Sequence, residues 1–424
     1  MNAIQVHKFG GASVKDADGV RNLLKVLQGF QSENLCVVLS AMGKTTNALE
    51  RLCKSFFNKS FDTESILLEV KEYHNDLIKE LFPSGNDELI SAIENIYAEL
   101  HWAIEEDQIK SYDYEYDQIV SQGEQLSTRI VASYLNSNGF EIDFIDARDL
   151  LRTDNTYREA KVEWLETNSL IHSNLKFSNS SIKRYLTQGF IGGTSENFTT
   201  TLGREGSDYT ASIIAYCLNA KEVIIWKDVP GVLNADPKEW GKATLIDELS
   251  YFDAIELTYY GATVIHPKTI KPLQNKLIPL RVKSFLNPNS SGTLIRENKD
   301  QKRVTSYIFK KQQYLLSIST RDFSFIVEEN LEEIFKAFNK SRVKINLMQQ
   351  AALTFSVCLS AEEARWTSLL QELQTNYKVK YNDDCELITV RHYSENLPEE
   401  FAKRGAILLE QRSRHTLQYV IKSN

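Results

Sequence analysis

The chain has 424 residues, of which 42% are apolar and 25% are charged, so it can form two or three soluble domains with a large buried core. Its net charge of −8, without a long run of one sign or an apolar run near ~20 residues, argues against nucleic-acid and membrane partners. Five scattered cysteines without a C-x-x-C pair, and an N-terminus unlike a signal peptide, indicate free thiols in a reducing cytoplasm rather than a disulfide framework or a zinc site.

Short apolar strands that end in glycines or small residues recur along the first 300 residues. Strands expected at 4–9 and 35–39 enclose a helix over about 16–30, and this order opens a parallel α/β sheet. The other elements expected in this half are a helical stretch over 46–138 and strands at 140–145, just before Gly189, at 223–226 and at 278–282. In such sheets the chemistry lies in the loops that follow the strands.

A polar, turn-rich stretch at 287–303 marks the expected domain boundary. Beyond it, the pattern over about 312–390 predicts one βαββαβ unit, which is the order of a small ferredoxin-like domain. A second, partial unit is expected over about 385–424, together with a strand at 305–310. The predicted fold is therefore α/β over 1–296, followed by two α+β modules over 305–424.

Two loops near the N-terminus are candidate ligand sites. In K-F-G-G-A-S-V (8–14), adjacent glycines let backbone N–H groups approach an anion, and Lys8 could bridge phosphates, although a plain tight turn is the alternative. In S-A-M-G-K-T-T-N (40–47), the G-K-T ending resembles a P-loop, but Val38 stands where that motif needs a glycine. This second segment is either a helix cap or a ligand-facing loop; its candidate donors are Ser40, Thr45, Thr46 and Asn47.

Three later segments add charged groups. Glu124 begins a helix in S-Q-G-E-Q-L, where it could favour the helix dipole or pair with a substrate ammonium. The strongest segment, G-F-I-G-G-T-S-E-N-F-T-T-T-L-G-R-E-G-S-D, joins a threonine-rich hairpin to a helix that Ser207 or Asp208 is expected to cap. Arg204 lies between glycines there as a planar fork for a carboxylate or phosphate. The last segment, V-I-I-W-K-D-V-P-G-V-L-N-A-D-P-K (223–238), is either an ordinary turn or a ledge for a nucleotide.

Together, and in this order, these segments resemble the aspartokinase family. That family shows K-F-G-G-T-S-V, V-S-A-M-G, a G-E pair, G-F-I-G-x-T, T-T-T-L-G-R-G-G-S-D, W-T-D-V-x-G-x-x-T-A-D-P-R and F-G-A-K-V-L-H-P-x-T, and the last of these reads Y-G-A-T-V-I-H-P-K-T here. The match covers roughly residues 4–295, and the C-terminal layout resembles the tandem ACT modules of the family.

The resemblance implies a fold, a reaction and a set of site residues. The fold is the α/β/α sandwich of amino-acid kinases, and the reaction is the ATP- and Mg²⁺-dependent phosphorylation of L-aspartate to 4-phospho-L-aspartate, the first step of lysine, threonine and methionine biosynthesis. The phosphate would be held by Lys8, Gly10, Gly11 and Ser40, with Asp208 orienting Lys8, and the substrate by Thr45, Glu124 (ammonium), Arg204 (α-carboxylate) and Ser207. The nucleotide would be held by Asp228, Gly231, Asp236 and Lys238, and we add Lys227 and Thr263 as nucleotide-binding candidates beside them. No side chain is assigned as a metal ligand.

The sequence also departs from the family pattern, mostly on the nucleotide side. The departures are Thr263 for lysine, Lys227 for threonine, Lys238 for arginine, Leu233 for tyrosine and Glu205 for the glycine beside Arg204. The first module also lacks the usual glycine turn, reading D-F-S-F-I-V-E-E-N. Two alternatives therefore stay open: an amino-acid-binding regulatory protein without phosphoryl transfer, and a kinase of the same fold for another small acid.

Assembly and regulation follow from the same resemblance as expectations. The length leaves no room for the dehydrogenase half of bifunctional relatives, so we expect a monofunctional enzyme. An incomplete second module would leave an exposed sheet edge, and such edges are usually paired or covered. We therefore expect a homodimer formed through residues 305–424, with lysine as the first candidate inhibitor and threonine as the next.

Overall fold

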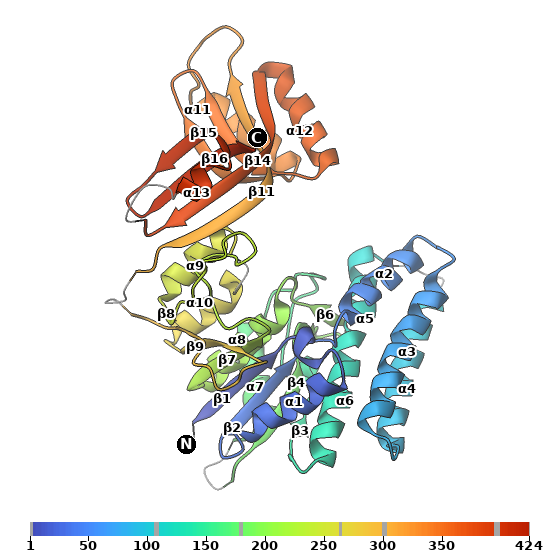
Figure 1. Ribbon diagram of the computed structural model, residues 1–424. Helices are drawn as coiled ribbons and strands as arrows, with labels where there is room; N and C mark the ends of the chain where they lie inside the picture. Colours follow the sequence, from blue (N-terminus) through green and yellow to red (C-terminus); the bar gives the residue numbers. More distant parts are fainter. Residues whose placement is uncertain are drawn as a thin grey trace. The chain divides into compact units, whose positions relative to one another are not determined.

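The computed structural model describes residues 3–105, 110–177, 181–262, 265–298, 303–393 and 399–423. The chain forms two compact units (Figure 1). Unit 1 comprises Met1–Val232, Leu245–Ile255 and Val264–Gln301, and unit 2 comprises Leu233–Thr244, Glu256–Thr263 and Lys302–Asn424. The two short internal segments of unit 2 carry no signal in the sequence that separates them from the first 300 residues.

In the described part of unit 1, a single eight-stranded sheet carries the fold. In spatial order its strands are β3 (Asp143–Phe144), β4 (Arg184–Gln188), β2 (Asn34–Leu39), β1 (Ile4–Phe9), β7 (Glu222–Lys227), β9 (Leu280–Ser284), β10 (Thr293–Ile295) and β8 (Glu248–Leu249). Neighbours are parallel except β9 and β10, which are antiparallel. The predicted α/β class is confirmed, whereas the strand expected over 140–145 shrinks to two residues.

Helices cover the sheet, so its central strands are buried even where they carry polar side chains such as Gln5 and His7. Every residue of β1 and β2 is buried, as expected for strands in a parallel sheet with helices on both sides. The helices of unit 1 are α1 (Ala17–Gln28), α2 (Thr45–Phe57), α3 (Thr63–Leu81), α4 (Asp87–Glu105), α5 (Tyr112–Val120), α6 (Gln122–Ser137), α7 (Trp164–Asn174), α8 (Gly206–Leu218) and α10 (Pro267–Asn275); α9 (Tyr251–Tyr260) begins in unit 1. Helix α8 packs on β1 and β7 beside α7 and α10, while α6 packs on β2 and β4.

The strand ends of unit 1 converge at one edge of the sheet. Phe9, the last residue of β1, is in register with Leu39 of β2 and with Trp226 of β7. Because parallel strands share a carboxyl edge, the loops after β1, β2 and β7 lie together there. The short turns η1 (Gly11–Val14) and η2 (Ala147–Asp149) and the antiparallel hairpin of β5 (Ile191–Gly193) and β6 (Thr199–Thr201) complete unit 1.

Unit 2 is built on one antiparallel sheet. Across its described residues, the strands run in the order β12 (Lys344–Gln350), β13 (Phe355–Ser360), β11 (Ser306–Ser319), β14 (Lys378–Arg391), β16 (Thr416–Ser423) and β15 (Gly405–Arg412), with helices α11 (Glu328–Lys340), α12 (Glu363–Asn376) and α13 (Glu399–Ala402). The chain order β11, α11, β12, β13, α12, β14 confirms the predicted βαββαβ unit. The separate strands expected at 305–310 and 314–319 are one strand, β11, with a bulge between Lys310 and Gln313.

The segment 233–244 packs inside unit 2. The Trp240 ring lies 4.5 Å from that of Tyr307 and 5.8 Å from that of Phe401, centroid to centroid. Arg404 donates to the Glu239 carbonyl at 2.8 Å, and Lys311 pairs with the Glu239 carboxylate at 2.7 Å. An aromatic cluster and ion pairs therefore fix this segment to the C-terminal sheet.

Two sequence-based expectations about the class of protein can be compared with the structure. All five cysteines are free and buried, as the scattered spacing predicted. Within the described ranges, no helix combines the length and apolar character needed to cross a bilayer.

Candidate active site

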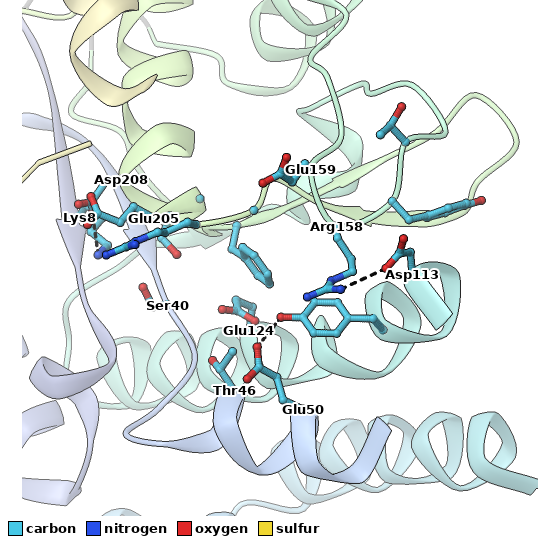
Figure 2. Close-up of a pocket in the computed structure, with 18 of the residues that line it drawn as sticks. Lys8, Ser40, Thr46, Glu50, Asp113, Glu124, Arg158, Glu159, Glu205 and Asp208 are labelled. Carbon is cyan, nitrogen blue, oxygen red and sulfur yellow. Dashed lines mark hydrogen bonds and ion pairs between the residues drawn. The ribbon is translucent and has the colours of Figure 1, made fainter. Parts of the chain in front are cut away.

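A cavity of about 870 Å³ opens at the carboxyl edge of the unit 1 sheet. The residues that line it are Lys8, Ser40, Thr46, Glu50, Asp113, Tyr116, Glu124, Thr156, Tyr157, Arg158, Glu159, Phe190, Gly203, Arg204, Glu205, Gly206, Ser207, Asp208 and Lys227. Figure 2 shows Lys8, Asp208 and Glu205 at one end, Arg158 and Asp113 at the other, and Glu124 between them. Residues singled out in the sequence before the resemblance was considered therefore meet in one place, and there are seven of them: Lys8, Ser40, Thr46, Glu124, Arg204, Ser207 and Asp208.

An ion pair joins β1 to the start of α8. Lys8 Nζ lies 2.6 Å from Asp208 Oδ1, and Lys227 Nζ lies 3.7 Å from Asp208 Oδ2. Burial alone would raise the pKa of Asp208, but the two ammonium groups outweigh this effect and hold that pKa below its usual range. Asp208 is therefore a carboxylate at neutral pH. The expected N-cap role of Ser207 or Asp208 is wrong, since α8 already begins at Gly206 with Glu205 as its N-cap.

Backbone hydrogen bonds join the loop after β1 to the loop after β2. Gly43 N donates to Gly11 O at 3.0 Å, and Ser40 N donates to Phe9 O at 3.1 Å. A Cβ on Gly11 would lie 2.6 Å from Ala41 O, which no side chain tolerates. Gly11 thus has a packing reason to be glycine. Gly10 and Gly11 adjoin the cavity through Lys8, but neither is among the residues that line it.

Glu124 is a buried carboxyl group, and only one of its two oxygens has a hydrogen-bond partner among the described residues. Its side chain stands in the first turn of α6, where Oε1 accepts from Ala41 N at 3.2 Å. Oε2 has no partner among the described residues, and only 2% of the residue is exposed. Burial raises the pKa of the Glu124 carboxyl to about 8. A buried acceptor without a donor is costly, so this oxygen is poised for a cationic ligand.

Arg204 is a cation of the cavity whose guanidinium is available to a ligand. It lies in the turn between β6 and α8, is exposed, and makes no hydrogen bond or ion pair with any residue that the structure describes. Ser207 lines the cavity beside it, in the first turn of α8. Gly189 allows this approach, since a Cβ there would lie 2.4 Å from Ser207 Cβ.

The two neighbouring threonines at the start of α2 have different surroundings. Thr45, the expected substrate contact, is buried with its hydroxyl 3.3 Å from His74 Nε2, and it does not line the cavity. Thr46 lines the cavity instead. Successive helix residues point about 100° apart, so the two hydroxyl groups face different surroundings. Thr46 therefore joins the candidate site, and the substrate contact expected of Thr45 stays a prediction.

The expected nucleotide residues are only partly brought together. Lys227 lines the cavity, whereas Asp228 and Gly231 follow β7 outside its lining. Asp236 and Lys238 belong to unit 2, where Asp236 Oδ1 accepts from Lys238 N at 2.8 Å in a turn. Thr263 lies outside the described residues. The roles of all six residues toward a nucleotide, that of Lys227 included, stay predictions.

Sequence reasoning missed one wall of the cavity. Arg158 pairs with Asp113 at 3.2 Å and stacks 4.5 Å over the ring of Tyr116. The Tyr116 hydroxyl donates to Glu50 at 2.6 Å (Figure 2). Arg158 has φ +65, and its backbone N–H donates to buried Asp117 at 3.0 Å. These residues come from α2, α5 and an irregular segment, so no local motif could have indicated them.

The geometry suits an anionic donor and a zwitterionic acceptor. One end offers two ammonium groups and the N-terminus of a helix, which attract phosphate. The buried Glu124 carboxyl suits an ammonium, and the Arg204 guanidinium, which has no partner among the described residues, suits a carboxylate. Among the described residues, no group of three or more His, Cys, Asp or Glu could hold a metal ion.

Comparisons with known proteins agree with this chemistry. The model of the amino acid kinase family matches residues 3–284. Aspartokinase 1 and aspartokinase 2 of Arabidopsis thaliana, both chloroplastic, are 32% and 31% identical to this chain; each alignment covers 87% of it and, respectively, 65% and 68% of the relative. The chain thus spans about two thirds of the length of these relatives.

Solved structures of Escherichia coli aspartokinase III are also similar. The structure in complex with lysine and aspartate superposes with a TM-score of 0.82 at 26% identity. The structure in complex with aspartate and ADP gives 0.81 at 25% identity. Each comparison covers 99% of this chain and 96% of the other.

Proposed function

Since the chain belongs to the amino acid kinase family, and within it to the aspartokinases, we propose that it transfers the γ-phosphoryl group of ATP to the side-chain carboxylate of L-aspartate. The product is 4-phospho-L-aspartate, the first intermediate of lysine, threonine and methionine biosynthesis. The observation that carries the proposal is one cavity that joins the Lys8–Asp208 pair to a buried carboxyl, Glu124, with a free oxygen.

Each end of the substrate has a chemical match in the cavity. Glu124 Oε2 accepts from the α-ammonium, which satisfies a buried oxygen that lacks a donor within the described part of the chain. Arg204 binds the α-carboxylate through its planar fork, and Thr46 and Ser207 donate to the same end. The side-chain carboxylate is then directed toward Lys8 and Ser40.

Catalysis needs no strong base, because the attacking carboxylate is already ionised at neutral pH. One of its oxygens forms a bond to the γ-phosphorus, the bond from that phosphorus to the bridging oxygen breaks, and ADP leaves with the electron pair. Lys8 neutralises charge on the transferred group, while Asp208 keeps the ammonium in place. Mg²⁺ enters this proposal as a companion of ATP, bound by phosphate oxygens.

A hydroxylamine trap for acyl phosphate tests the reaction. The purified chain is incubated with ATP, Mg²⁺ and aspartate, glutamate or another small acid, and hydroxamate is measured. We expect hydroxamate with aspartate, above the level with every other acid. Signal with another acid alone would identify a kinase of different specificity, and aspartate binding without turnover would identify a regulatory protein that has lost phosphoryl transfer.

Aspartate use should depend on pH through Glu124. Burial raises the pKa of this carboxyl to about 8 in the free enzyme, and only its ionised form attracts the substrate ammonium. We therefore expect kcat/KM for aspartate to rise by about tenfold per pH unit below pH 8, and to level off above it while the substrate amine keeps its proton. Glu124→Gln, which keeps the size of the side chain, should remove this rise. A flat profile in the unchanged enzyme would contradict the assignment.

We further propose that two chains pair through unit 2. Strand β12 is a sheet edge, and beside it lies a cluster of exposed apolar side chains, the edge cluster, made of Phe323, Phe325, Val327, Met348 and Leu353. Hydrogen bonds from Ile326 N to Ala352 O (3.0 Å) and from Gln350 Nε2 to Ile326 O (3.1 Å) hold its two segments together. Exposed edges and apolar clusters of this kind are usually covered.

Sedimentation measures this association. The full chain is expected to be a dimer, and Phe325→Glu with Met348→Glu is expected to be a monomer. Phe61→Glu, which changes an exposed phenylalanine of unit 1, is the matched control and should stay dimeric. Millimolar lysine, or failing that threonine, should inhibit the dimer and not the monomer. A monomeric full chain would rule out the pairing.

A further inference from the structure

A second lysine shares the buried carboxylate of the phosphate end. Asp208 uses Oδ1 for Lys8 at 2.6 Å and Oδ2 for Lys227 at 3.7 Å. The Asp208 side chain is 3% exposed, and those of Lys8 and Lys227 are 10% and 21% exposed. Both lysines line the same cavity. One carboxylate therefore holds two ammonium groups from two different strands.

The local charges leave an excess of one positive charge at this end. Asp208 is ionised, because the two lysines hold its pKa below the usual range. Glu124, the next carboxyl, is largely protonated at neutral pH, since burial raises its pKa to about 8. Glu205 and Arg204, adjacent in the chain, line the cavity as well, and their formal charges cancel; the Glu205 Oε2 also accepts from His266 N at 2.9 Å. With two ammonium groups beside one carboxylate, one positive charge remains to attract an anionic ligand.

The backbone around Lys227 fixes where its ammonium can reach. Lys227 is the last residue of β7, one position past Trp226, which is in register with Phe9 of β1. The Lys227 carbonyl accepts from Phe285 N at 2.8 Å, so the strand end is held from the β9 side. Lys227 thus approaches Asp208 from the side of β7, whereas Lys8 approaches it from β1.

We propose that Lys227 is a second catalytic cation for phosphoryl transfer, and this inference rests on the proposed function. Lys8, next to the loops that carry Gly10 and Ser40, contacts the transferred phosphoryl group. Lys227, on the β7 side, contacts the β-phosphate and neutralises the charge that collects there when the bridging P–O bond breaks. By pairing with both lysines, the Asp208 carboxylate holds the two ammonium groups where both can contact one polyphosphate.

The alternative is that Lys227 only balances the charge of Asp208. In that case its loss would lower stability and leave ADP binding and kcat unchanged, because Lys8 remains 2.6 Å from the carboxylate. A catalytic cation predicts the opposite: an intact fold, weaker binding of ADP and slower turnover. The two roles therefore differ in a binding measurement that needs no turnover.

The experiment compares Lys227→Met with Lys283→Met. Lys283 lies on the neighbouring strand, in register with Trp226, and does not line the cavity, so it is a control for loss of a nearby charge. We expect Lys227→Met to lower kcat by about 100-fold and to weaken calorimetric binding of ADP with Mg²⁺ by about tenfold. The KM for aspartate should stay within about twofold, because a cation at the β-phosphate does not touch the amino acid, and Lys283→Met should resemble the unchanged chain.

Chemical rescue adds a second line of evidence. Methylammonium should restore part of kcat to Lys227→Ala, because it supplies an ammonium to the vacated space, and it should not affect the unchanged enzyme. Unchanged ADP binding and kcat in Lys227→Met would overturn the inference while leaving the proposed function intact. If the unchanged chain binds ADP but forms no hydroxamate, the proposed function fails instead, and the ADP measurement still tests whether Lys227 contacts the nucleotide.

Discussion

Replacing Lys8 with alanine is expected to reduce kcat by about 1,000-fold or more, without unfolding the chain. The Lys8 ammonium is 2.6 Å from a buried carboxylate, adjoins Gly10 and lines the cavity. The ammonium group is therefore held in position before the substrates bind. No free energy is needed to reorient it during the reaction. In the proposed reaction, this ammonium neutralises charge on the transferred phosphoryl group.

The fold should survive, because Asp208 keeps one partner. Lys227 stays 3.7 Å from Oδ2 after Lys8 is removed. We expect a loss of about 1–3 kcal/mol in the free energy of unfolding, the range for a weakened charge-assisted contact. Circular dichroism and thermal denaturation check this, alongside kcat from the hydroxamate assay.

Lys15 offers the matched control for this substitution. It belongs to the same loop, its side chain is 63% exposed, and its contact with Asp16 is 4.0 Å long. Lys15→Ala should therefore keep kcat within about twofold. A near-normal kcat in Lys8→Ala would show that Lys8 does not bind the transferred phosphate. If Lys8→Ala does not fold, Lys8→Met, which keeps most of the length of the side chain, is measured in its place.

The parts of the site that sequence reasoning predicted share a physical cause. Glycines and charged residues directly after apolar strands have to lie at the carboxyl edge of a parallel sheet, so Lys8 and Ser40 could be placed from one sequence. Helix starts such as the one at Glu124 bring a side chain to the same edge. The order of strands and helices in the ferredoxin-like unit could also be predicted, since apolar residues repeat with a period of about 2 in its strands and about 3.6 in its helices.

What could not be predicted depends on contacts between distant segments. Thr45 and Thr46 are equivalent in sequence, and only the packing of His74 against Thr45 decides which one faces the cavity. Arg158 reaches the cavity through a left-handed backbone that buried Asp117 holds. The assignment of 233–244 to unit 2 likewise rests on Trp240 meeting aromatic residues far along the chain.

The continuity of β11 was missed for a local reason. Lys311, Gln312 and Gln313 interrupt the apolar alternation, so the sequence indicated two strands. Gln312 adopts φ +54, and the bulge there lets the ladder with β14 continue on both sides. A polar interruption therefore kinked the strand without ending it, and the two predicted modules share one sheet.

Removing either charge of the amino-acid site should raise the KM for aspartate far more than that for ATP. We expect Arg204→Ala and Glu124→Gln each to raise it about 10–150-fold, which corresponds to roughly 1.5–3 kcal/mol for a desolvated charge-assisted contact. Arg204 has no partner among the described residues, so its removal breaks no contact in the free enzyme. Glu124→Gln keeps an oxygen for the 3.2 Å bond from Ala41 N, so the loop after β2 should hold its shape.

The far wall of the same cavity supplies controls of matching chemistry. Arg158→Ala removes a guanidinium that already pairs with Asp113, and Glu159→Gln removes an exposed carboxylate. Because neither residue adjoins Lys8 or Glu124 in the cavity, both variants should change the KM for aspartate by less than about threefold. Initial rates at varied aspartate with saturating ATP, and the reverse, give the two KM values. If Arg158→Ala raised the KM for aspartate while Arg204→Ala did not, the α-carboxylate would bind at the opposite end of the cavity from the one proposed. The phosphoryl group and the acceptor carboxylate would then lie too far apart for transfer, and the amino-acid site would have to be rebuilt around Arg158.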